Sequence, residues 1–174
     1  MPDRIEPADE PASVESTAFV ALGANLGDAV ATLRAALAAL GRLPGTRLVR
    51  ASRFVRSPSA GAPGPDYVNA VAELRTALDP LALLRALLAI EQTHGRRRGP
   101  RNAPRTLDLD LLLFDDLVLD TPELVLPHPR LHERAFVLVP LADLDAQRVV
   151  PGRGRVVDLL PSVGDQRLDT LTPP

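Results

Sequence analysis

Two aspartates, Asp108 and Asp110, have the spacing in this chain that most directly suggests chemistry. They lie in the segment LDLDLLLF at residues 107–114, whose apolar residues predict a β-strand. Side chains two positions apart in a strand point to the same face, so the two carboxylates share one face and the alternating leucines share the other. Two carboxylates this close repel each other, and a bound Mg²⁺ ion would relieve the repulsion. The alternative is a strand with a solvated polar face.

An arginine-rich segment directly precedes these aspartates. Glycines and prolines interrupt it, which predicts a loop and not a helix face. Guanidinium groups on such a loop repel one another, and they suit a highly charged anion that orders the loop on binding. The alternatives are a solvated basic loop and a loop that contacts RNA, although it has no aromatic residue for base stacking. The arginines are Arg96, Arg97, Arg98, Arg101 and Arg105.

Two more residues could belong to such a site. Glu91 lies beside the apolar stripe of a predicted helix, so we expect its carboxylate to be partly buried and held by an arginine or by ligand hydroxyls. His128 lies in a rigid turn between Pro127 and Pro129 and could touch a phosphate. The simpler interpretations are a helix-end glutamate that extends into solvent and a surface histidine.

Tyr67 and Asn69 could recognise an organic ligand. They lie two residues apart at the start of a predicted strand, so they share a face. An aromatic ring that stacks, beside an amide that both donates and accepts, could bind a flat heterocycle. Ordinary core packing of the tyrosine is the alternative.

The composition narrows the classes of function. The 174 residues predict one domain, and the net charge of −2 gives no global attraction to nucleic acid or anionic lipid. There is no cysteine, and all 20 basic residues are arginine, which excludes thiolate and lysine Schiff-base chemistry. No apolar run reaches the ~18 residues of a membrane span, and the acidic N-terminal segment lacks the apolar region of a secretory signal. We therefore expect a cytoplasmic enzyme or binding domain.

The predicted elements alternate between strands and helices. Asp79 followed by Pro80 predicts the start of a helix that runs to about His94. We expect residues 117–119 to pair with residues 107–114 as a hairpin, and a helix to begin at about Glu133. The other predicted elements are strands at 18–23, 46–57 and 67–76, a helix that follows GANLGD and ends near Gly41, and a short helix at 156–160.

These elements predict an α+β sandwich, because their connections are too short for an all-parallel sheet. A mostly antiparallel sheet would carry helices packed on it. We expect a disordered N-terminal tail over residues 1–17, a single domain over residues 18–165, and a flexible C-terminal tail over residues 166–174.

Four motifs together resemble one known family, the 6-hydroxymethyl-7,8-dihydropterin pyrophosphokinases. They are FVALGANLGD, PDYVNAVAEL, IEQTHGRRRGPRNAPRTLDLDLLLFDD and LPHPRLHERAFVLVPLADL, in the order and spacing typical of that family. The resemblance covers about residues 18 to 145. It implies a ferredoxin-like fold and a folate-biosynthesis enzyme that transfers the β,γ-diphosphate of ATP to the hydroxymethyl group of the pterin and releases AMP.

The resemblance also implies a role for individual residues. Asp108 and Asp110 would bind two Mg²⁺ ions and act as catalytic residues together with Arg96 and Arg105. ATP would be bound by Glu91, which holds the ribose, and by phosphate contacts from Arg96, Arg98, Arg105 and His128. The pterin would lie between Tyr67 and Phe136, with Asn69 at its edge and the turn of Ser57 and Pro58 facing the ring. Arg134 falls on a motif position near the site.

The chain departs from the family pattern at a few positions. Asn102 and Ala103 stand where the family usually has an aromatic residue followed by glycine, Pro129 replaces another aromatic residue, and Ala24 replaces a common serine. Because none of these positions is an implied metal ligand, we expect activity to be retained.

The expected partners are therefore small molecules, ATP and the hydroxymethyl-dihydropterin. We expect a monomer that binds neither nucleic acid nor membrane. Two other classes stay open at this point. A non-catalytic ferredoxin-like ligand-binding module would not need paired aspartates beside an arginine loop, and an RNA-binding module would show steeply salt-dependent binding of oligonucleotides.

Overall fold

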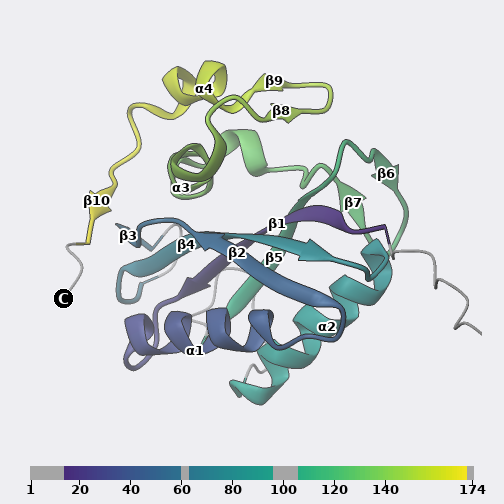
Figure 1. Cartoon of the computed structure of the whole chain (residues 1–174). Coiled ribbons are helices and arrows are strands. Elements are labelled where there is room, and N and C mark those ends of the chain that lie inside the picture. Colours follow the sequence, from purple (N-terminus) through teal and green to yellow (C-terminus); the bar gives the residue numbers. More distant parts are fainter. Residues whose placement is uncertain (1–13, 60–62, 96–105, 172–174) are drawn as a thin grey trace, which may run out of the picture.

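The computed structural model describes residues 14–59, 63–95 and 106–171. Its centre is an antiparallel sheet with helices on both faces (Figure 1). The strand order is β10-β3-β4-β1-β5, and β2 pairs with β4 on the same edge as β3. The chain runs β1-α1-β2/β3-β4-α2-β5, which is the β-α-β-β-α-β connectivity of ferredoxin-like folds. The predicted fold class is confirmed.

The strands of the main sheet are β1 (Ser16–Ala24), β2 (Thr46–Ala51), β3 (Val55–Ser57), β4 (Tyr67–Thr76), β5 (Asp108–Phe114) and β10 (Asp169–Thr170). Two small hairpins are formed by β6 (Leu119–Asp120) with β7 (Val125–Leu126), and by β8 (Val149–Val150) with β9 (Gly154–Arg155). The helices are α1 (Ala29–Gly41), α2 (Pro80–Thr93), α3 (Ala135–Asp145) and α4 (Val156–Leu159), with 3₁₀ turns η1 (Leu131–Glu133) and η2 (Leu160–Val163).

The sheet separates two hydrophobic cores because side chains alternate along each strand. Val20 of β1 belongs to the core beneath the sheet, together with Leu33 of α1 and Leu87 of α2. Phe19, the preceding residue, belongs to the core on the other face, together with Leu138 of α3. In Figure 1, α1 and α2 accordingly lie on one face of the sheet and α3 on the opposite face.

Local sequence signals determine where the two long helices begin. Asp28 accepts a hydrogen bond from Ala31 N at 3.0 Å through Oδ1, and Asp79 accepts one from Ala82 N at 2.8 Å in the same way. Each aspartate satisfies a backbone N–H that the first helical turn leaves without a partner. Pro80 follows at the first position of α2, where proline loses no helical hydrogen bond. The predicted helix from Asp79 to about His94 is confirmed.

Two predictions for strands were wrong. The strand expected over residues 46–57 is interrupted between β2 and β3, where Ser52 Oγ accepts a hydrogen bond from Val71 N and replaces a backbone partner in the ladder. Residues 117–119 do not pair with β5, because Leu119 pairs with Leu126 instead. Asp115, with φ of 48°, turns the chain away from β5. Its backbone N donates a hydrogen bond to Thr17 O, and its Oδ1 accepts one from Thr17 N.

The ends of the chain also differ from the prediction. β1 begins at Ser16, inside the expected N-terminal tail. In the expected C-terminal tail, β10 pairs with β3, and Leu171 N donates to Phe54 O at 2.9 Å. Short strands such as β10 carry little periodicity, so the sequence does not reveal that they pair with a distant edge. The helix expected at about Glu133 begins at Ala135, after the 3₁₀ turn η1.

No helix within the described residues is both long enough and apolar enough to cross a membrane.

Replacing the capping aspartate of α2 should weaken the fold measurably. We expect Asp79→Ala to lower the free energy of unfolding by about 1 kcal/mol, because the hydrogen bond to Ala82 N is lost. Urea denaturation followed by circular dichroism would measure this change. Asp120→Ala, an exposed aspartate at the end of β6, is the control, and equal effects of the two substitutions would contradict the capping role.

Candidate active site

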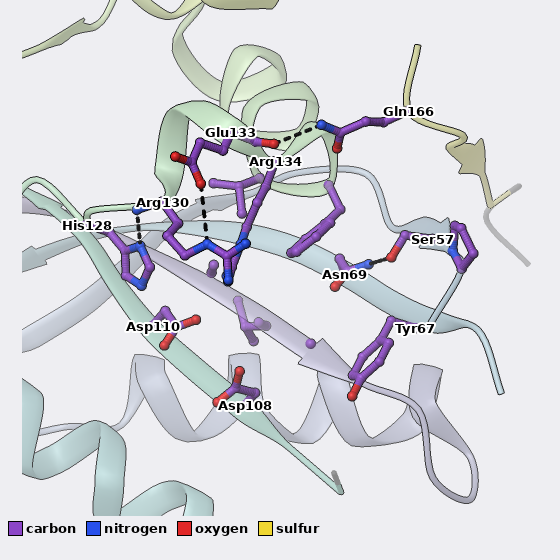
Figure 2. Close-up of a pocket in the computed structure, with 16 residues that line it drawn as sticks. Ser57, Tyr67, Asn69, Asp108, Asp110, His128, Arg130, Glu133, Arg134 and Gln166 are labelled. Atoms are coloured by element: carbon purple, nitrogen blue, oxygen red, sulfur yellow. Dashed lines mark hydrogen bonds and ion pairs between the residues drawn. The ribbon is translucent and has the colours of Figure 1, made fainter. Parts of the chain in front are cut away.

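Strand pairing brings residues of β1, β4 and β5 together on the face of the sheet that carries α3. Gly23 lies opposite Asn69 of β4 and opposite Asp108 of β5. Directly opposed residues of an antiparallel pair project to the same face, so Asn69 and Asp108 flank a position that has no side chain. This position belongs to the floor of an open pocket of about 520 Å³, which the turn before α3 and α3 itself cover (Figure 2).

The two aspartates lie where the sequence predicts them. Asp108 and Asp110 are half-buried and both line the pocket, while Leu109 between them is buried in the core beneath the sheet. Within the described residues, no group of three or more His, Cys, Asp or Glu side chains could hold a metal ion by itself. Two carboxylates beside an open cavity suit Mg²⁺, which keeps several waters and commonly takes its remaining oxygens from substrate phosphates.

Glu91 is buried, with 1% of its surface exposed, more deeply than the partial burial that the sequence predicts. Its Oε1 accepts a hydrogen bond from Leu109 N at 2.7 Å. Leu109 lies between the two aspartates on β5, which is an edge strand of the sheet. The Glu91 carboxylate therefore satisfies a backbone N–H at the sheet edge. The structure therefore adds a backbone partner that the sequence does not suggest, and Glu91 braces the segment that carries both aspartates.

Positive charge lies across the pocket from these carboxylates. Arg130 and Arg134 line the cavity on the side of α3, above Asp108 and Asp110 in Figure 2. Burial lowers the pKa of Arg134, and the positive charge of Arg130 lowers it further, while Asp110 and Asp108 oppose the shift. Arginine remains charged in spite of such shifts. Arg130 Nε donates to Glu133 Oε2 at 3.3 Å, which partly balances the local charge.

His128 lies on the same side of the pocket. Its backbone N donates to Leu112 O at 2.9 Å, and its Nδ1 accepts a hydrogen bond from Arg130 N at 3.2 Å. This contact assigns the proton of the neutral ring to Nε2, which can donate to an acceptor in the pocket. Burial lowers the pKa of His128, and the charges of Arg134 and Arg130 lower it too, against the opposing effect of Asp108.

The other part of the pocket could hold a flat ring. Tyr67 comes from the sheet and Phe136 from α3, so each layer supplies one aromatic side chain to the cavity. Asn69 Nδ2 donates to Ser57 Oγ at 2.8 Å in a buried contact. This contact orients the amide and places its Oδ1 near Gly23, where an added methyl group would come within 3.1 Å of that oxygen. Pro58 also lines this part of the pocket.

The structure thus brings most of the predicted site residues together. Asp108, Asp110 and His128 line one pocket with the predicted aromatic and amide residues. The predicted phosphate contacts Arg96, Arg98 and Arg105, like Asn102 and Ala103, lie outside the described residues.

Several residues that line the pocket were missed by the sequence predictions. They are the apolar Ala21, Leu22 and Val137, together with Gly23, Arg130, Glu133 and Gln166. Arg130 and Glu133 are close in sequence to His128, and this closeness to a predicted site residue could have identified them. Gln166 lies in the segment predicted to be a tail and carried no such signal.

A model of the 7,8-dihydro-6-hydroxymethylpterin-pyrophosphokinase (HPPK) family matches residues 19–146. A 2-amino-4-hydroxy-6-hydroxymethyldihydropteridine pyrophosphokinase of Haemophilus influenzae is 42% identical over 158 residues, which are 90% of this chain and 99% of that protein. The protein of the same name from Pseudomonas aeruginosa is 48% identical over 154 residues, covering 86% of this chain and 95% of that one.

Solved structures show the same fold at low sequence identity. An HPPK-DHPS in complex with substrates superposes with a TM-score of 0.67 at 14% identity, over 85% of this chain. The wild-type HPPK-DHPS of Plasmodium falciparum with SDX-DHP gives a TM-score of 0.64 at 15% identity, over 84% of this chain. This chain spans only 43% of the length of either of these structures.

The lowered pKa of His128 should make the stability of the protein depend on pH. Below the ordinary histidine value of 6.5, the unfolded chain binds a proton at this residue more readily than the folded chain does. The free energy of unfolding should therefore fall as the pH drops through 6.5 toward the folded pKa. Urea denaturation at several pH values would measure the slope. We expect His128→Gln to reduce it, and equal slopes in the two proteins would contradict the assignment.

Proposed function

The chain belongs to the 7,8-dihydro-6-hydroxymethylpterin-pyrophosphokinase family, and from this membership we propose its reaction. It transfers the β,γ-diphosphate of ATP to the hydroxymethyl group of 6-hydroxymethyl-7,8-dihydropterin and releases AMP, a step of folate biosynthesis. The observation that carries this proposal is the composition of one pocket. Paired carboxylates, facing arginines and an aromatic slot with an amide at its edge line the same cavity.

The paired carboxylates fit the magnesium ions that the family implies. Asp108 and Asp110 would hold two Mg²⁺ ions, with the phosphates and water as further ligands. When bound, these ions neutralise the triphosphate and lower the pKa of the attacking hydroxyl group. Glu91 maintains the backbone geometry between the two aspartates through Leu109 N.

We propose that Arg134 and His128 bind the phosphates of ATP. Arg134 and the neutral His128, through Nε2–H, would donate hydrogen bonds to phosphate oxygens from the side opposite the aspartates. These donors are already in position, so they stabilise charge that develops during transfer without reorganising. The roles of Arg96, Arg98 and Arg105 as further phosphate contacts, and of Glu91 at the ribose, remain proposals from the family motif.

The aromatic slot would bind the pterin. Tyr67 and Phe136 would stack on the two faces of the ring, and Asn69 would bind its edge while Ser57 Oγ orients the amide. The backbone at Ser57 and Pro58 would face the ring. Because this slot and the carboxylates share one cavity, the hydroxymethyl group can lie near the phosphates.

The transfer itself exchanges one P–O bond for another. The hydroxymethyl oxygen forms a bond to the β-phosphorus and loses its proton, while the bond from that phosphorus to the oxygen of the α-phosphate breaks. AMP leaves with that oxygen. The protein's contribution is positioning and charge neutralisation, which dominate catalysis of phosphoryl-type transfer.

We also propose a cytoplasmic monomer that acts on these small molecules and on neither nucleic acid nor membrane. Equilibrium sedimentation would test the monomer, and a stable dimer at micromolar concentration would contradict it.

An assay of AMP release tests the function directly. We expect AMP to form from ATP only when both Mg²⁺ and the hydroxymethyl-dihydropterin are present. Asp110→Ala should lower this rate by at least about 100-fold, because a carboxylate that holds charge at the reaction centre is lost. Asp120→Ala is the control and should behave as the unmodified protein. Absence of pterin-dependent AMP would reject the enzyme in favour of a binding module.

Adding a methyl group at Gly23 should weaken pterin binding. The new Cβ would lie 3.1 Å from Asn69 Oδ1 and displace the amide from the ring edge. We expect Gly23→Ala to raise the KM for the pterin by about threefold or more, the effect of weakening one hydrogen bond, and to change the KM for ATP less. Gly41→Ala, whose Cβ meets only an ordinary contact at 3.5 Å, is the control. An unchanged pterin KM would contradict the role of Gly23.

A further inference from the structure

Two helix ends meet at Arg134, one of the residues that line the pocket. The 3₁₀ turn η1 ends at Glu133 and α3 begins at Ala135, so Arg134 alone separates them, with an extended backbone at φ −124° and ψ 113°. The side chain of Arg134, the N-cap residue of α3, makes no capping hydrogen bond. Helix ends expose backbone N–H and C=O groups that need partners from elsewhere.

Gln166 supplies a partner to both ends at once. Its Oε1 accepts a hydrogen bond from Ala135 N at 2.9 Å. Its Nε2 donates one to Glu133 O at 2.8 Å (Figure 2). A primary amide both donates and accepts, so a single side chain can bind the residues before and after Arg134. Gln166 is more than thirty positions away along the chain, and the contact is therefore entirely tertiary.

The segment that carries Gln166 is itself held on both sides. Before it, Val163 is buried in the core on the α3 face and accepts a hydrogen bond from Gln166 N at 3.1 Å. After it, β10 pairs with β3, and Leu171 N bonds to Phe54 O. The C-terminal segment therefore forms a brace from the edge of the sheet, next to Ser57, to the start of α3.

This brace acts on the two side chains that flank Ala135. Arg134 and Phe136 both line the pocket, and the guanidinium carbon of Arg134 lies 5.5 Å from the centre of the Phe136 ring. A small rotation of the first turn of α3 would move both groups relative to the aspartates on the floor. Misplacement of about 1 Å can cost a large factor in rate when catalysis depends on positioning.

We propose that Gln166 is a positioning residue for the diphosphate transfer, which acts by holding Arg134 and Phe136 in the pocket. This inference rests on the proposed function. Gln166 is exposed on the surface, so its loss removes two hydrogen bonds without opening the core. Activity should therefore suffer more than stability.

The first experiment compares three variants. Gln166→Ala removes both hydrogen bonds, and Gln166→Glu keeps the acceptor for Ala135 N but loses the donor to Glu133 O. Gln147→Ala is the matched control, because Gln147 is also exposed and also makes a side-chain hydrogen bond, with Arg155 Nη1 at 2.7 Å, without lining the pocket. For each variant, kcat, the KM of both substrates and the urea midpoint would be measured.

We expect Gln166→Ala to lower kcat/KM for the pterin by about tenfold, the combined effect of two modest hydrogen bonds. Gln166→Glu should lose at least as much, because it places a carboxylate oxygen against Glu133 O, where Nε2 donates in the unmodified protein. Gln147→Ala should stay within about twofold of the unmodified protein, at a similar urea midpoint. Near-normal kcat/KM in Gln166→Ala, or in Gln166→Glu, would overturn the proposal. A loss of kcat/KM that is fully explained by a larger fraction of unfolded protein would also overturn the proposal.

A double-mutant cycle tests whether Gln166 acts through Arg134. If it does, the effect of Gln166→Ala on kcat/KM for the pterin should be smaller in the Arg134→Ala background than in the unmodified protein, and the remaining effect is the part that acts through Phe136. An undiminished effect would overturn this route.

Amide hydrogen exchange gives a readout that does not depend on activity. The N–H of Ala135 should exchange faster in Gln166→Ala than in the unmodified protein or in Gln147→Ala, because its acceptor is lost. Unchanged exchange would overturn the brace. If the unmodified protein released no pterin-dependent AMP, the proposed function would fail, while the exchange rates would still report on the brace.

Discussion

The pairing of β1 with β4 and β5 is the constraint on which the site depends. Because side chains alternate along a strand, a shift of one residue in this register would turn Asp108 and Asp110 into the core and expose the neighbouring leucines. Burial of Leu109 and Leu111 against the helices beneath the sheet opposes such a shift. The hydrophobic core on one face thus determines where the carboxylates lie on the other, and Gly23 leaves the space between them and Asn69 open.

The second constraint is electrostatic. The pocket has carboxylates on its floor and guanidinium groups on the side of α3, and Arg134 is half-buried, which lowers its pKa. A partly desolvated cavity with both positive and negative side chains suits a ligand that also carries both charges, such as a metal-bound polyphosphate. Helix α3 holds the positive side, and its first residues are held in turn by Gln166.

Elements with strong local signals were predicted correctly. The capping residue Asp79, the helical spacing of apolar residues and the alternation in β4 and β5 all depend on neighbours within a few positions. The wrong predictions concern contacts made at a distance. Nothing near Leu119 shows that it pairs with Leu126 instead of β5, and nothing near Asp169 shows that it pairs with β3. Such choices depend on which edge is accessible once the sheet has formed.

The same division applies to the site. Residue types and their spacing were enough to predict that Asp108 and Asp110 share a face, that Tyr67 and Asn69 share a face of another strand, and which family the motifs resemble. These facts follow from residue type and a period of two. Three further features became evident only in the folded protein: Glu91 binds Leu109 N, Arg130 lines the pocket, and Gln166 binds both sides of Arg134. Hydrogen bonds between distant segments depend on how the layers pack, and no local pattern encodes that packing.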